Sequence, residues 1–251
     1  MMPNIIISER ASSSSDLAIN AAKKKLPEWT SYLVKEQSKG RGRLGSLWES
    51  PKGNLHLSIL IYPKISKKSL PKLSFVAALA VRNSINYLLK DFKIDIKFKW
   101  PNDILVNNHK IGGILIETSS NNSVIIGVGL NLKVNPKKEK YNWPTQNIFN
   151  LTGKEIKPYF ISLKIIKEMK KMLEILLKTG FDYLRKEWKK YAAFIGQEVI
   201  SSKLDDSICG VFEDVGINGE MLIKTKDLNE IRIFSDSVIP LEMVEKYVAS
   251  Y

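Results

Sequence analysis

The sequence predicts an α+β fold, in which a central mixed or antiparallel sheet with flanking helices is followed by a small β-barrel. Short segments of alternating apolar and polar residues recur before residue 133 and are typical of strands with one buried face. Two long segments with apolar residues at helical spacing predict helices against that sheet. After Gly196 the chain consists of short β-rich runs separated by Asp, Asn and Gly, which favours a small barrel.

Six strands are expected in the first part of the chain. They are Ile5–Ser8, Ser31–Glu36, Asn54–Tyr62, Asp95–Trp100, Lys110–Glu117 and Val124–Leu132. The odd positions from Leu55 to Ile61 are apolar, so we expect the third strand to bury one face. The pairs Asn107-Asn108 and Asn121-Asn122 predict tight turns, so the last three strands form an antiparallel meander.

Four helices are expected between and after these strands. They are Asp16–Lys24, Leu70–Lys90, Tyr159–Lys178 and Phe181–Tyr191. A serine before Asp16 is the expected N-cap of the first helix, Ser69 caps the second with Pro71 in its first turn, and Gly180 ends the third. The remaining long segments, Lys39–Gly53 and Lys133–Lys157, are expected to be loops.

Four or five short strands are expected in the last 55 residues or so. The β-rich runs are Glu198–Leu204, Ser207–Asp214, Glu220–Thr225 and Glu230–Phe234. Because short β-rich runs replace the longer strand and helix patterns near residue 195, we predict two domains, residues 1–195 and residues 196–251.

Composition narrows the classes of protein to which the chain can belong. The 251 residues include 44% hydrophobic residues, an ordinary share for a globular core, and a single cysteine, Cys209, which excludes a disulfide scaffold. No apolar run is long enough to span a bilayer, and the N-terminus lacks the features of a signal peptide. We therefore expect a cytoplasmic protein with no membrane partner.

The net charge of +13 admits an anionic partner. However, 33 of the 39 basic residues are lysines spread along the whole chain, as a general compositional bias would produce. No helix-turn-helix, zinc finger or aromatic RNA-binding motif accompanies the charge, so DNA binding is not expected. The informative arginines are Arg41 and Arg43, which lie two positions apart.

These two arginines lie in a glycine-rich segment, Gly40–Gly45, that matches the pattern G-x-G-x-x-G. A dinucleotide-binding loop would open a helix, but here a loop with Pro51 and a strand follow. No Lys-Ser/Thr pair follows the glycines and no kinase motif lies downstream, so neither a P-loop nor a kinase is indicated. The segment predicts a flexible loop whose guanidinium groups bind carboxylate or phosphate oxygens; a solvated basic turn is the alternative.

Three further segments carry polar side chains or glycines at strand ends. In Lys99–Asp103 a Trp-Pro pair ends a strand, so Lys99, Asn102 and Asp103 can converge there. Lys110 begins a strand that contains paired glycines, and Gly127 and Gly129 lie inside another strand that Asn131 follows. Such glycines allow a ligand or a second backbone to approach closely; a capped hairpin and plain bulges are the alternatives.

The histidines, the serines and the cysteine indicate no metal site and no catalytic nucleophile. His56 and His109 have no metal-like partners in the sequence, so each is expected to be a structural or surface histidine, and no metal site is expected. No Ser-His-Asp pattern occurs, and Cys209 falls in the small barrel, where it is expected to be a buried apolar residue.

Taken together, the four segments Gln37–Arg43, Lys99–Asp103, Lys110–Glu117 and Gly127–Asn131 resemble those of biotin–protein ligases in order and spacing, and Ser13–Ala18 occupies the place of that family's Ser-Thr-Asn stretch. The resemblance covers nearly the whole chain. It implies a catalytic domain like that of class II synthetases and an SH3-like C-terminal domain. It also implies the short form without an N-terminal winged-helix domain, and therefore no repressor role.

The resemblance implies an enzyme that activates biotin with ATP and Mg²⁺ to biotinyl-5′-AMP. The biotinyl group then passes to a lysine of a biotin carboxyl carrier domain; a homodimer is left open. The implied biotin contacts are Ser13, Ser14, Ser15, Gln37, Gly40, Arg41, Gly42, Arg43, Lys110, Gly112 and Gly113, and the implied ATP contacts are Lys99, Asn102, Asp103, Asn131 and Trp143. Since the first step joins two anions, Lys110, Arg41 and Arg43 are the expected catalytic cations.

Two alternatives remain at this point. A lipoate or octanoate ligase or transferase would share the fold, although the catalytic cysteine that some of these enzymes use has no counterpart in the first domain. A non-enzymatic basic protein that binds nucleic acid is the second alternative, and salt-sensitive DNA binding without ATP turnover would identify it.

Overall fold

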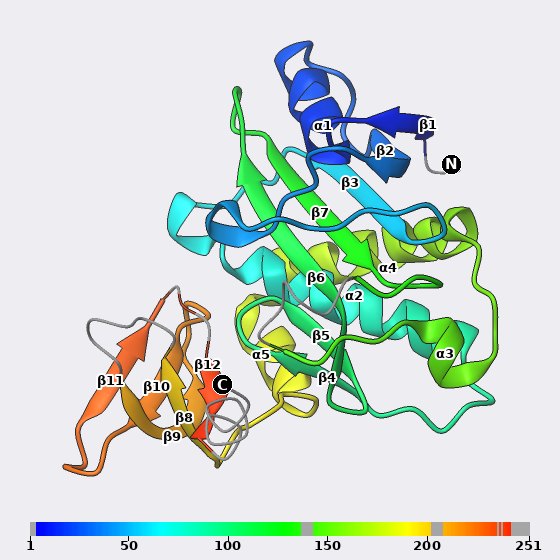
Figure 1. The fold of residues 1–251 in the computed structure, drawn as a ribbon. Coiled ribbons are helices and arrows are strands. Elements are labelled where there is room, and N and C mark those ends of the chain that lie inside the picture. Colours follow the sequence, from blue (N-terminus) through cyan, green and yellow to red (C-terminus); the bar gives the residue numbers. More distant parts are fainter. Residues whose placement is uncertain (1–3, 137–142, 202–207, 235, 237, 242–251) are drawn as a thin grey trace.

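A seven-stranded sheet dominates the computed structural model, which describes residues 4–136, 143–201, 208–234, 236 and 238–241. Its strands are β1 (Ile5–Ala11), β2 (Ser31–Gln37), β3 (Leu55–Ile61), β4 (Ile96–Lys99), β5 (Asp103–Val106), β6 (His109–Thr118) and β7 (Val124–Leu130). The order across the sheet is β1-β2-β3-β7-β6-β5-β4 (Figure 1). Only the β1–β2 pair is parallel among these strand pairs, so the sheet is mixed, as expected.

Two expectations about these strands are wrong. The expected three-strand meander has four strands, because Asp103–Val106 forms a strand that pairs with both β4 and β6. This strand is only four residues long, too short for its alternation to be recognised. In addition, β3 buries all seven residues rather than one face. The reason is its central position, because β2 and β7 flank it and other elements cover both of its faces.

Five α-helices are described: α1 (Ser14–Lys23), α2 (Lys72–Leu88), α3 (Ile148–Thr152), α4 (Pro158–Thr179) and α5 (Phe181–Lys189). Ser13 caps α1 by accepting a hydrogen bond from the Asp16 backbone N–H, and Gly180 follows α4, both as expected. Ser69 does not cap α2, because it belongs to a 3₁₀ turn, and Pro71 takes the cap position. The helix α3 lies in the segment expected to be a loop; Asn147 caps it.

The helices lie on two faces of the sheet. The alternation along β3 directs Leu57 and Ile59 into the main core, which also contains the buried residues of α2, α4 and α5. Leu60 of β3 packs instead in a smaller cluster with alanines of α1. The face with α1 is thus only partly covered by helix, and it carries the polar residues His56 and Ser58 of β3. No described helix is long and apolar enough to cross a membrane.

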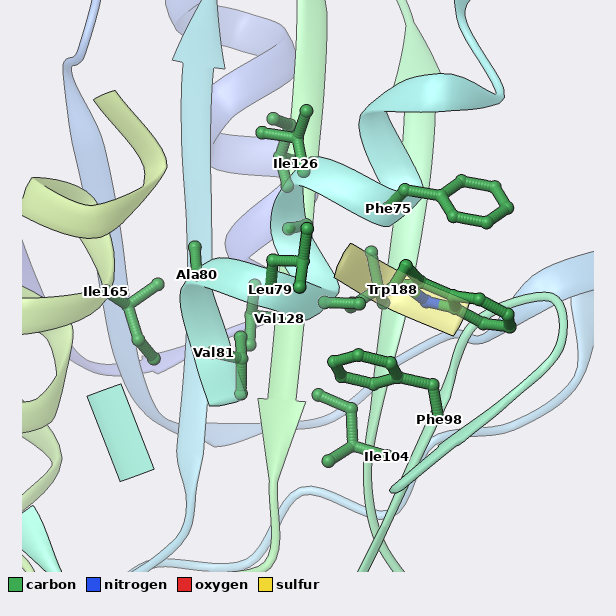
Figure 2. Close-up of a cluster of buried hydrophobic side chains, with 14 of the residues drawn as sticks. Phe75, Leu79, Ala80, Val81, Phe98, Ile104, Ile126, Val128, Ile165 and Trp188 are labelled. Atoms are coloured by element: carbon green, nitrogen blue, oxygen red, sulfur yellow. The ribbon is translucent and has the colours of Figure 1, made fainter. Parts of the chain in front are cut away.

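Aromatic packing closes the main core at the end of the sheet near β4. Trp188 of α5 stacks on Phe98 of β4, with ring centroids 5.5 Å apart, and Phe75 of α2 lies 4.9 Å from the Trp188 ring (Figure 2). Trp188 therefore joins one strand and two helices.

A second, antiparallel sheet lies beside α5 (Figure 1). Its strands are β8 (Glu198–Ser201), β9 (Cys209–Val215), β10 (Met221–Lys224), β11 (Glu230–Ile233) and β12 (Val238–Pro240), in the order β11-β10-β9-β8-β12. The expected strand ends at Leu204 and Ser207 lie outside the described residues. The indole N–H of Trp100 donates to the Gly219 carbonyl oxygen, which ties the second sheet to the first. A domain division at residue 195 stays a prediction.

We predict that Trp188→Ala lowers the free energy of unfolding by about 3–5 kcal/mol, because a large buried ring leaves a cavity among Phe75 and Phe98. Tyr183→Ala on the exposed side of the same helix is the matched control and should change it by less than about 1 kcal/mol. Urea unfolding followed by circular dichroism measures both, and equal losses in the two variants would contradict this description of the core.

Candidate functional site

A cavity of about 430 Å³ lies on the sheet face that carries α1. Its lining includes most of the residues that the sequence singled out: Ser13, Ser14, Ser15, Gln37, Arg41, Gly42, Arg43, Asn102, Asp103, Lys110 and Gly113. They come from the start of α1, the end of β2, the glycine-rich loop and strands β5 and β6. Residues more than 90 positions apart in sequence thus share one cavity.

Glycines form the floor of this cavity. In the register of the sheet Gly129 of β7 lies between His56 of β3 and Gly113 of β6, and Gly127 lies opposite Ser58. A Cβ at Gly129 would come within 2.5 Å of the Trp48 indole, so the indole can lie against this strand only because residue 129 has no side chain. The expectation that strand glycines permit a close approach is confirmed for Gly129.

Hydroxyl and amide groups gather at one end of the cavity. The Ser14 and Ser15 hydroxyls lie 2.8 and 3.1 Å from the Ser58 hydroxyl, and the backbone N–H of Ser14 donates to Gln37 Oε1 over 2.6 Å. Gln37 Nε2 in turn donates to Ser50 Oγ. We refer to Ser13, Ser14, Ser15, Gln37 and Ser58 as the polar end of the cavity.

Hydrogen-bond counting shows what the polar end offers a ligand. Ser13 Oγ accepts hydrogen bonds from the Asp16 backbone N–H and from Arg41 Nη1, and its hydroxyl donates to the Asp16 carboxylate, a contact that helps to lower the pKa of Asp16. Gln37 donates one of its two Nε2 protons to Ser50, which leaves the second as a donor. This remaining Gln37 proton suits a ligand carbonyl oxygen.

The glycine-rich loop folds back on itself as a hairpin, and the flexibility expected of it stays a prediction. Arg41 and Leu47 form an antiparallel bridge, and the backbone N–H of Gly42 donates to the Ser46 carbonyl oxygen. Gly40 lies behind the cavity, where a Cβ would meet Ser50 Oγ and the Trp48 carbonyl oxygen at 2.4 Å. Glycine at position 40 is therefore needed for the loop to fold back on itself.

Arg41 and Arg43 have different environments. Arg41 forms ion pairs with Asp16 at 2.7 Å and with Glu117 at 2.9 Å. Burial lowers the pKa of Arg41, but these two carboxylates outweigh it and raise the pKa above the ordinary value. Arg41 thus fastens the loop to α1 and β6, and its charge is already balanced by protein groups.

Arg43 lies deeper, beside groups from both sheets. Its Nη1 donates to Asn102 Oδ1 at 3.3 Å and to the backbone carbonyl oxygen of Asp236 at 3.2 Å. Burial lowers the pKa of Arg43, and the nearby carboxylates of Asp103 and Asp236 oppose that shift. A guanidinium group so placed can meet an anion inside the cavity.

Two lysines flank Asp103 at the end of the cavity opposite the polar end. Lys110 Nζ lies 2.7 Å from one carboxylate oxygen of Asp103, and Lys99 Nζ lies 3.8 Å from the other. Lys99 is only 3% exposed, and burial lowers its pKa while Asp103 opposes the shift. We refer to Arg43, Lys99 and Lys110 as the cationic end of the cavity.

The remaining residues singled out by the sequence lie outside the cavity. Gly112 faces away from it, where a Cβ would meet Leu130 at 2.4 Å. Asn131 lines a small neighbouring hollow together with Trp48 and Lys110, and its Nδ2 donates to the Gln146 carbonyl oxygen. Lys99 does not line the cavity itself either, but reaches it through Asp103.

Trp143 is buried and takes no part in the cavity lining. Its ring packs against Phe194, with Lys99 Nζ 5.3 Å from the ring centre, and its indole N–H donates to the Asn108 carbonyl oxygen. The ring thus packs beside Lys99, and a contact of Trp143 with ATP stays a prediction.

Among the lining residues that sequence reasoning missed are Trp48, His56, Ser58 and Asp236. Trp48 could have been noticed as an aromatic residue within the glycine-rich loop. His56 and Ser58 stand at the polar positions of an alternating strand, for which the sequence predicts a buried face at the odd positions only. Asp236 reaches the cavity from the second sheet, a tertiary contact without a local signal in the sequence.

His56 is buried, as a structural histidine would be, but only one of its ring nitrogens is paired. Among the described residues no group of three or more His, Cys, Asp or Glu side chains could hold a metal ion by itself. The cavity thus joins a neutral polar end to a cationic end, with an open glycine floor between them.

The chain was compared with known proteins. Residues 8–135, slightly more than half of the chain, match the profile of the Biotin/lipoate A/B protein ligase family. The chain belongs to this family. The matched residues contain both ends of the cavity and all of its lining residues except Asp236.

Members of the family align over most of the chain. The Bacillus subtilis bifunctional ligase/repressor BirA is 28% identical over 234 residues, which are 90% of this chain and 71% of that protein. The biotin–[acetyl-CoA-carboxylase] ligase of Paracoccus denitrificans is 30% identical over 199 residues, 76% of this chain and 82% of that protein.

A solved structure agrees in fold over almost the whole chain. The biotin protein ligase from Aquifex aeolicus, in complex with biotin and ATP, superposes with a TM-score of 0.83 at 26% identity and covers 94% of this chain and 99% of its own. Since the superposition covers 94% of this chain, it extends into the second sheet, and the arrangement of both sheets resembles that of the Aquifex protein.

Proposed function

We propose that this protein is a biotin–protein ligase, which activates biotin with ATP to biotinyl-5′-AMP and transfers the biotinyl group to a lysine of a carboxylase carrier domain. The observation that carries the proposal is the pairing of the two ends of the cavity. A cyclic urea needs several hydrogen-bond partners, as the polar end supplies, and a carboxylate and an α-phosphate need cations. The relatives and the solved structure described above are named as biotin ligases.

A lipoate ligase is less well supported by the polar end. The dithiolane ring of lipoate has no N–H or carbonyl group, so on binding it would cover the second Nε2 proton of Gln37 without accepting a hydrogen bond from it. Each buried polar group left unpaired costs about 1–3 kcal/mol. The geometry therefore favours biotin over lipoate, and a protein that only binds nucleic acid would not need a cavity of this kind.

In the first reaction a carboxylate oxygen of biotin attacks the α-phosphorus of ATP, and the bond from that phosphorus to the pyrophosphate oxygen breaks. Lys110 and Arg43 offset the negative charges that the reaction brings together. In the second reaction the ε-amine of the carrier lysine attacks the acyl carbon, the bond to AMP oxygen breaks and the amine loses a proton. Neither reaction needs a nucleophile from this protein.

Mg²⁺ fits the cationic end as an ion carried by the phosphates. Asn102 and Asp103 offer the oxygen ligands that Mg²⁺ prefers, but the described residues hold no larger cluster that would bind the ion alone. Bound there, it would offset phosphate charge during the attack. We also propose that the protein acts in the cytoplasm, where its single cysteine stays reduced.

We predict ATP–pyrophosphate exchange that requires Mg²⁺ and biotin. Isotope exchange between labelled pyrophosphate and ATP measures it, with lipoate in place of biotin as the matched control. Exchange that lipoate supports and biotin does not would refute the proposed function.

Arg43→Ala is expected to release biotinyl-5′-AMP into solution before transfer, because the guanidinium group no longer holds the mixed anhydride under the loop. Rapid filtration or quenched flow gives the release rate. Arg10→Ala, on the exposed edge strand β1, is the control and should match the parent protein. Equal release rates from all three proteins would argue against a role for Arg43 in retention.

Lys110→Ala is expected to slow formation of the adenylate by about 10²–10³-fold, because one preorganised charge beside the carboxylate and the α-phosphate is lost. Lys110→Arg should also be slow, since a planar guanidinium group does not replace the compact ammonium group next to Gly113. Single-turnover adenylation at saturating biotin and ATP measures the rate, with Lys97→Ala on the edge strand β4 as the control. A Lys110→Ala rate within twofold of the parent would mean that Lys110 is not catalytic.

A further inference from the structure

His56 lies on the cavity wall with one ring nitrogen fixed by the protein. The side chain is 2% exposed and lines the cavity. Its Nδ1 atom lies 3.0 Å from the backbone carbonyl oxygen of Val34 on β2. Because a carbonyl oxygen only accepts hydrogen bonds, Nδ1 carries the proton and donates.

The second nitrogen, Nε2, is therefore an acceptor. Burial lowers the pKa of His56 to about 4, so the ring is neutral near neutral pH and Nε2 bears a lone pair. The Nε2 atom is buried and has no hydrogen-bond partner among the described residues. Buried polar atoms without a partner are rare in folded proteins, and an apolar ring at this position would avoid the cost.

The Trp48 indole lies over Gly129 on the β7 side of the ring, so a ligand N–H reaches Nε2 where the indole gives way. Nδ1 faces β2, so Nε2 faces the other side of the ring, and the residue paired with His56 on β7 is Gly129, which has no side chain. Two positions further along β3, Ser58 faces the same side and belongs to the polar end of the cavity. Side chains at such positions are about 7 Å apart, the width of a small fused ring.

We propose that His56 Nε2 accepts a hydrogen bond from a ring N–H of the acyl substrate and so selects a cyclic urea over a ring without N–H groups. The inference rests on the proposed function, because it concerns the head of the same substrate. The polar end offers a Gln37 Nε2 proton for the urea carbonyl oxygen, and His56 supplies an acceptor for a urea N–H. A dithiolane offers no proton to Nε2 and leaves it unpaired.

Nitrogen NMR of the parent protein tests this contact without a substitution. The chain has two histidines, so ¹⁵N-histidine labelling gives two rings, and His109→Gln assigns them. Biotin is expected to shift the Nε2 resonance of His56 in the direction of hydrogen-bond acceptance, while ATP alone leaves it in place. Binding of biotin without that shift would overturn the inference and leave the proposed function intact.

Two variants test the selectivity. His56→Phe keeps a planar ring but removes the acceptor, and should weaken biotin binding about tenfold while ATP affinity stays the same. His56→Gln offers an amide oxygen near the place of Nε2 and should retain most of the affinity. Calorimetric titration measures both ligands, and equal biotin affinity of the Phe variant and the parent would overturn the inference. Failure of the parent to bind biotin at all would refute the proposed function and this inference with it.

Discussion

The absence of side chains at three glycines of β6 and β7 keeps one face of the sheet open. Large apolar side chains of β3 and β7 point to the opposite face, where α2, α4 and α5 cover them. On the cavity face Gly113, Gly127 and Gly129 leave bare backbone between β3 and β5. The polar end, the cationic end and the Trp48 indole are all arranged around this strip. A larger residue in the strip would remove the space in which the two ends act together.

The cationic end shows how a sheet can hold like charges close together. Lys99 and Lys110 come from different strands and would repel each other in a buried site, and Asp103 lies between them. Two carboxylates, Asp103 and Asp236, face the three cationic side chains of this end, which leaves a net positive site into which a substrate anion fits. Arg41, by contrast, is balanced by Asp16 and Glu117 and holds the loop in place. Basic residues that look equivalent in the sequence thus have different roles, because their ion-pair partners differ.

Much of the fold could be predicted from periodicity and turn residues. Strands β2, β4, β6 and β7, the helices α2 and α4 and the asparagine turns follow from local patterns. The short strand β5 and the full burial of β3 could not be predicted, because both depend on neighbouring strands. The same holds for the site: glycines and charged residues stand out in the sequence, whereas Ser58 and His56 differ from exposed polar residues only through what covers them. Asp236 and Trp143 depend on packing between distant segments.

The role of the bare strip can be tested by adding one methyl group to it. A Cβ at Gly127 would lie 3.4 Å from Ser15 Oγ and 3.5 Å from Leu115, which are ordinary contacts that the fold can accept. The free energy of unfolding of Gly127→Ala should therefore lie within about 1 kcal/mol of that of the parent protein. The variant should nevertheless bind biotin at least about tenfold more weakly, because the methyl group occupies the floor of the cavity beside Ser58. Calorimetric titration of the folded variant with biotin is the measurement. Unchanged biotin affinity in a folded Gly127→Ala protein would contradict the account.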